Sequence, residues 1–150
     1  MSYIQNAHSP LTKKSYHFAI RIVNLVKFIN CSPKEYGMLN QVFRSGTAIG
    51  ALVSEAVYAQ SPADFVNKLS IALKECNETL YWLNILHDTE YVSKEQYDSM
   101  NTDCQELLAL LIASIKTTKQ NKEIKWMCKR KQIFHFSLFT FTLDYGSKIK

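Results

Sequence analysis

Four histidines and a small group of glutamates are the side chains that could carry catalysis in this chain. Helical bundles that hold two iron ions take a Glu-x-x-His pair from facing helices, and zinc peptidases take H-E-x-x-H. No histidine here has a glutamate three residues before it, and H-E-x-x-H does not occur. The sequence therefore predicts no metal site at the histidines, which are His8, His17, His87 and His135.

Glu55, Glu75 and Glu78 could lie near one another, and paired carboxylates can share a proton and act as acid and base. Glu75 and Glu78 are three residues apart beside Lys74, so we favour ion pairs with Arg44 and with neighbouring subunits. No glycine-rich phosphate loop and no nucleophile elbow occurs. We therefore expect no enzyme, no cofactor and no small-molecule substrate.

Basic residues are the candidates for binding RNA or DNA. Near the C-terminus they surround Trp126, and lysine or arginine interleaved with an aromatic ring is typical of surfaces that contact phosphates and stack a base. A solvated extension of the preceding helix explains the same pattern. The predicted phosphate contacts are Lys13, Lys14, Arg44, Lys125, Lys129, Arg130 and Lys131.

Serine-proline pairs place the starts of the helices. Serine at the N-cap accepts a hydrogen bond from the first turn, and proline at the next position has no N–H to leave unpaired. Ser9-Pro10, Ser32-Pro33 and Ser61-Pro62 predict three starts, and the capping box Ser93-Lys94-Glu95-Gln96 predicts a fourth. Apolar steps of three and four residues follow each start. The sequence predicts an all-α, antiparallel up-down-up-down bundle with helices at about 10–30, 33–59, 62–89 and 94–119.

Two features indicate surfaces beyond one bundle core. Gly46 and Gly50 allow close approach of a neighbouring helix, inside the bundle or between subunits. The helix at 62–89 has apolar residues around much of its circumference, and Tyr81 and Trp82 cannot both reach one core. We expect a second, intersubunit interface. Its predicted residues are Gly46, Gly50, Glu55, Glu75, Glu78, Tyr81 and Trp82.

Charge is unevenly distributed along the chain. The net charge is +4 over residues 1–60, −4 over residues 61–120 and +5 over residues 121–150. A basic half and an acidic half would be complementary between the subunits of a ring, although the same split could balance helices within one bundle.

Residues 121–150 form a predicted tail beyond a bundle of residues 1–120. Its first part is basic. Residues 133–143 carry no charge, no glycine and no proline, and their apolar residues alternate with a shift of phase, which predicts a β-like segment with a bulge.

The expected compartment is the cytoplasm. The chain has no apolar run of about 18 residues, and its first ten residues lack the apolar region of a secretory signal. The four cysteines form no C-x-x-C motif, and two fall on helical core positions, so we interpret them as reduced. No membrane partner is expected.

Two stretches resemble a bacterial family. They are residues 43–50, Phe-Arg-Ser-Gly-Thr-Ala-Ile-Gly with Ser54-Glu55-Ala56, and residues 64–75 with Glu78-Thr79-Leu80-Tyr81-Trp82-Leu83. They resemble the four helix bundle proteins, also called 23S rRNA intervening-sequence proteins, over roughly residues 13–120, and are similar to accessory proteins of diversity-generating retroelements.

This resemblance implies a four-helix bundle assembled as a ring-shaped homopentamer, and nucleic-acid binding in the retroelement relatives. Leu52 stands where relatives usually have Asn, and the tail is longer than usual. The sequence thus predicts a non-catalytic, homo-oligomeric scaffold, with an RNA- or DNA-binding accessory protein as the alternative.

Overall fold

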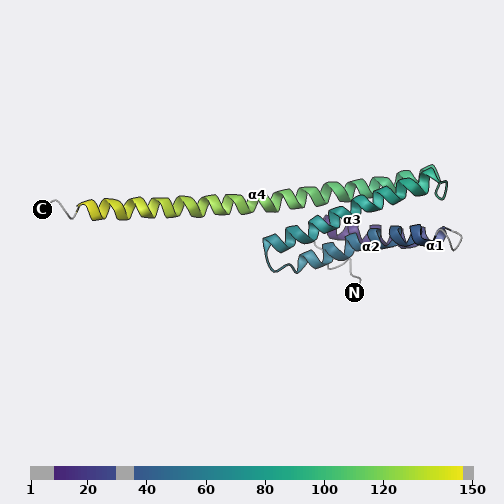
Figure 1. Cartoon of the computed structure of the whole chain (residues 1–150), viewed down its shortest axis with the longest axis horizontal. Helices are drawn as coiled ribbons and strands as arrows, with labels where there is room; N and C mark the ends of the chain where they lie inside the picture. The colour runs from purple at the N-terminus through teal and green to yellow at the C-terminus, as the bar shows by residue number, and fades with distance from the viewer. Residues whose placement is uncertain (1–8, 30–35, 147–150) are drawn as a thin grey trace. The chain divides into compact units, whose positions relative to one another are not determined.

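The computed structural model of the chain describes residues 9–29 and 36–146, with side chains described for residues 9–29 and 36–121. It contains four helices, α1 (Pro10–Phe28), α2 (Tyr36–Val57), α3 (Pro62–Asp88) and α4 (Lys94–Gly146), shown in Figure 1. The described residues contain no strand. The predicted all-α four-helix fold is therefore confirmed. The chain divides into two compact units, Met1–Ile115 and Lys116–Lys150.

Side-chain caps fix where three of the helices begin. Ser9 Oγ accepts a hydrogen bond from the Thr12 N–H, and Ser61 Oγ accepts one from the Asp64 N–H, both at 3.1 Å. Ser93 and Gln96 form a reciprocal capping box, in which the Ser93 N–H donates to Gln96 Oε1 at 2.9 Å. The predicted starts at residues 10, 62 and 94 are confirmed. The start predicted at Pro33 lies outside the described residues.

The core of the first unit is built from one apolar stripe on each helix. On α3 the buried side chains recur every three or four residues, as an a/d seam requires. Polar groups inside the core are paired, and no buried side-chain nitrogen or oxygen lacks a hydrogen-bond partner among the residues described. The largest fully buried apolar side chains are Phe18, Ile22, Ile49, Leu69, Leu83, Leu86, Leu107 and Leu111.

The prediction for the end of the chain was wrong. The helix expected to end near residue 119 continues to Gly146, so the segment at 133–143 is helical and not β-like. Between residues 94 and 145 the sequence has no glycine or proline to stop the helix, and extending an existing helix costs little once it is nucleated. A helix also satisfies its own backbone hydrogen bonds, whereas a lone strand needs a partner.

Candidate interaction surfaces

The aromatic pair of α3 lies outside the core stripe. Tyr81 is 58% exposed, and Trp82 is half-buried where it packs on the edge of the core. Their ring centroids are 5.0 Å apart at 72°, an edge-to-face contact. Trp82 Nε1 donates a hydrogen bond to Glu78 Oε1 at 3.3 Å, which directs the indole along the helix surface. Neither ring is enclosed by its own bundle.

One side of α3 carries Lys68, Glu75, Glu78 and Trp82, at spacings of seven, three and four residues. Lys68 Nζ reaches Glu55 of α2 at 2.6 Å, so this side borders α2. The hydrogen bond and the charge of Glu55 raise the pKa of Lys68 above its ordinary value of 10.5. We call these residues together with Arg44, Glu55 and Tyr81 the α2–α3 face.

Arg44 belongs to this face through the register of the two helices. Ser45, the next residue of α2, accepts a hydrogen bond from Thr79 of α3, so Arg44 and Glu78 lie at the level of that bond. Arg44 is exposed, while Glu75 and Glu78 are half-buried. None of the three forms an ion pair within the described residues. The face thus combines exposed aromatic surface with unpaired charges of both signs.

Gly46 and Gly50 lie against α1 inside the same chain. A Cβ atom at Gly46 would come within 2.6 Å of the Ile22 side chain, and one at Gly50 within 3.2 Å of the Ser15 carbonyl oxygen. Both distances are too short for an unstrained contact. The two glycines therefore allow the close packing of α1 on α2 inside one chain. This is the first of the two roles that the sequence left open for them.

Of the predicted phosphate contacts, Lys13 and Arg44 are exposed and form no ion pair in the described part of the chain. Lys14 forms an ion pair, since its Nζ lies 2.7 Å from Glu106 Oε2 of α4. The remaining four belong to a stretch of α4 whose side chains lie outside the description, and they are Lys125, Lys129, Arg130 and Lys131.

Some of the basic and acidic residues balance one another between helices of the same bundle. Lys14 and Arg21 of α1 pair with Glu106 and Asp103 of α4, joining the basic half to the acidic half inside one chain. These pairs are partly exposed and each contributes little to stability. Arg44, Glu75 and Glu78 of the α2–α3 face are among the charges that form no ion pair within the described residues, so they remain for contacts between molecules.

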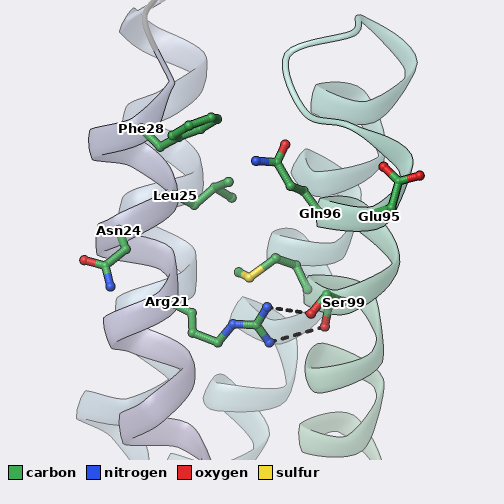
Figure 2. A pocket seen from close by; sticks show the side chains of 8 residues that line it. Arg21, Asn24, Leu25, Phe28, Glu95, Gln96 and Ser99 are labelled. Atoms are coloured by element: carbon green, nitrogen blue, oxygen red, sulfur yellow. Dashed lines mark hydrogen bonds between the residues drawn. The ribbon is translucent and has the colours of Figure 1, made fainter.

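A groove of about 500 Å³ lies between α1 and α4 (Figure 2). Its apolar side chains include Leu25 and Met100, and Phe28 stands at its rim, 67% exposed. The guanidinium of Arg21 donates to Ser99 Oγ at 2.8 Å and also pairs with Asp103. Sequence patterns did not single out this groove, because its lining comes from two helices whose relative register no motif encodes.

Four polar residues of the groove, Arg21, Glu95, Gln96 and Ser99, already make hydrogen bonds within the chain. Gln96 closes the capping box of α4, and Glu95 Oε2 accepts a hydrogen bond from Ser93 Oγ at 2.8 Å. No group of three or more histidine, cysteine or acidic side chains in the described residues could hold a metal ion. Nor does any helix, within the described residues, have the length and hydrophobicity to cross a membrane.

Residues 8–113 match the family model for the 23S rRNA-intervening sequence protein. The chain belongs to this family. The match spans α1, α2, α3 and the first part of α4, and residues 114–150 lie beyond it. The two stretches that carry the resemblance lie on α2 and α3, inside the matched range.

A solved structure agrees with this family assignment. It is a protein of unknown function from the S23 ribosomal protein family of Bacteroides thetaiotaomicron VPI-5482, 57% identical in sequence. The similarity covers 71% of this chain and 98% of that one, with a TM-score of 0.68. No curated protein matches the chain.

Proposed function

We propose that this intervening-sequence protein is a non-catalytic cytoplasmic scaffold that assembles with copies of itself through the α2–α3 face. The resemblance described above gives a ring of five as the expected assembly. A ring joins one surface of each subunit to a different surface of the next, so the face needs a complementary partner surface and not a copy of itself.

The observation that carries this proposal is the position of Tyr81 and Trp82. Large aromatic side chains are enriched in subunit interfaces, where they bury apolar area with little loss of conformational entropy. Here they lie beside one another on the outside of α3, although the same helix already buries a complete apolar stripe. A second copy that covers this pair would remove its apolar surface from water.

Unpaired charge on the same face supports the proposal. Glu75 and Glu78 are half-buried, and a carboxylate that loses water without a cation is costly. A basic group from the neighbouring subunit would compensate them, and an acidic group would do the same for Arg44. Such complementary pairs fix the register and the association rate of an interface more than its affinity.

The test is a charge placed on the aromatic pair. Tyr81→Glu should lower the association of the full chain at least tenfold while leaving the helical circular dichroism unchanged, because a buried unpaired carboxylate opposes assembly. Tyr58→Glu is the matched control, since Tyr58 is 84% exposed at the end of α2. If native mass spectrometry finds the same number of copies in assemblies of Tyr81→Glu and of the parent protein, the α2–α3 face is not the subunit interface.

A second candidate function is contact with RNA or DNA, favoured by Lys13 and Arg44, which are exposed and form no ion pair with any described residue. Affinity for a labelled single strand should then fall steeply with salt, with a slope that grows with each phosphate neutralised. Arg44→Gln should reduce the slope by about one unit relative to the parent protein. Lys14→Gln is expected to change it less, because Lys14 is paired with Glu106. No binding at low salt would eliminate this candidate.

A further inference from the structure

Two cysteine side chains meet in the middle of the core. Cys76 of α3 and Cys104 of α4 are both fully buried free thiols, and their Sγ atoms lie 3.4 Å apart. Each Sγ also lies 3.5 Å from the backbone carbonyl oxygen of the other cysteine. The two residues thus face each other symmetrically across the contact between the helices.

The two sulfur atoms are in van der Waals contact but not bonded. A disulfide requires an S–S distance of about 2.05 Å, so the two sulfurs must approach by roughly 1.4 Å. Rotation of one or both side chains about χ1 moves Sγ over that range, because Sγ lies at the end of a single rotatable bond. The helices themselves are already side by side, as the paired carbonyl contacts require.

We propose that Cys76 and Cys104 close into an intramolecular disulfide joining α3 to α4 when hydrogen peroxide reaches them during local opening of the bundle. The thiolate of one cysteine attacks an oxygen of hydrogen peroxide, which gives a sulfenic acid and releases hydroxide. The second thiol then attacks the sulfenic sulfur, forming the S–S bond and releasing water. Two thiols and one peroxide become one disulfide and two waters, with two electrons passing from sulfur to oxygen.

The reaction is gated by the environment of the thiols. The hydrogen bond with Cys76, followed by burial, raises the pKa of Cys104, so Cys104 forms little thiolate in the closed bundle at neutral pH. Hydrogen peroxide is small, but it must reach side chains with no exposed surface. The pair therefore stays reduced under ordinary conditions and responds to sustained peroxide or to local opening of the bundle.

The disulfide would stabilise the bundle against unfolding. It encloses the turn between α3 and α4, a loop spanning 28 residues, and removes conformations from the unfolded chain. The thermal midpoint of unfolding should rise by roughly 5–10 °C and return after reduction with dithiothreitol. This consequence holds for a single chain and for a ring, so it does not depend on the proposed assembly.

The experiment uses the full chain with Cys31→Ser and Cys128→Ser, which leaves the pair as the remaining thiols. After hydrogen peroxide and catalase, the protein is unfolded with an alkylating reagent and weighed intact. We expect no alkylated cysteine, a loss of about 2 Da for two hydrogen atoms, and a linked tryptic peptide containing both residues. Dithiothreitol should restore two alkylation sites.

Two outcomes would overturn the proposal. One is alkylation of both cysteines after peroxide has oxidised the half-buried Met38 of the same molecules. The other is accumulation of sulfinic acid on either cysteine without a cross-link. Cys104→Ser in the same background supplies the control for the thermal shift, which should vanish. If that variant fails to fold, the intact mass and the linked peptide of the two-cysteine chain still show whether the disulfide forms.

Discussion

Thr79 of α3 donates a hydrogen bond to Ser45 of α2 at 3.0 Å, in a part of the core where both side chains are buried. The Ser45 hydroxyl donates in turn to the Gln41 carbonyl oxygen at 2.8 Å. The Thr79 hydroxyl also lies 2.8 Å from the Glu75 carbonyl oxygen. This short chain of bonds sets the register between the two helices that form the α2–α3 face.

Thr79→Val keeps the volume of the side chain and removes its hydroxyl, so Ser45 loses its buried donor. We expect the free energy of unfolding to fall by about 1–2 kcal/mol. Urea unfolding followed by circular dichroism measures this change. Thr102→Val is the matched control, because Thr102 is exposed and its hydroxyl donates to the Asp98 carbonyl oxygen of its own helix. A loss at residue 102 as large as that at residue 79 would contradict the register argument.

Gly46→Ala adds a methyl group against Ile22. The overpacking should lower the free energy of unfolding by about 1–2 kcal/mol, even though alanine favours the helix. Ile22→Val in the same chain should restore part of the loss. Gly37→Ala is the control, since a Cβ there meets nothing within 4 Å and should stabilise the helix slightly. A stabilised Gly46→Ala variant would show that α1 and α2 do not pack closely at this point.

Ser93→Ala removes both the cap of α4 and the hydrogen bond to Glu95. That hydrogen bond is the largest of the effects that lower the pKa of Glu95 below its ordinary value of 4.5. Because the folded pKa is depressed, the bond contributes stability above pH 4.5 that is lost as the pH falls through the folded value. We expect the Glu95 pKa to rise in the variant, measured by NMR titration of its carboxyl carbon.

Loss of the same cap should cost about 1 kcal/mol of stability near neutral pH. Ser93→Thr preserves the hydroxyl and should retain most of both effects. If Glu95 titrates identically in Ser93→Ala and in the parent protein, the hydroxyl is not the group that holds its pKa down.

Local signals predicted much of the fold. The Ser61-Pro62 and Ser93-to-Gln96 patterns encode caps within one turn of chain, and the structure forms them as hydrogen bonds. The sequence also showed that apolar residues around Tyr81 lie outside the core stripe, because a helix buries only one stripe against one core. Contacts between helices were not predictable in this way. Whether Gly46 meets Ile22 or another subunit depends on how two helices cross.

The groove and the thiol pair show the same limit. Arg21 and Ser99 are far apart in the sequence, as are Cys76 and Cys104, and their contacts follow from the register of α1 and α3 against α4. The error at 133–143 has a different origin. Alternating aromatic residues favour a strand locally, but an uninterrupted helix that begins at Lys94 continues through them.

Self-association is decided by the mass of the full chain in solution. Sedimentation velocity at micromolar concentration should show a species that is a multiple of 17.3 kDa, with five copies giving about 87 kDa. Dilution should populate smaller species as the interface dissociates. A single 17.3 kDa species across the whole concentration range would contradict the proposal that copies of the chain cover the α2–α3 face.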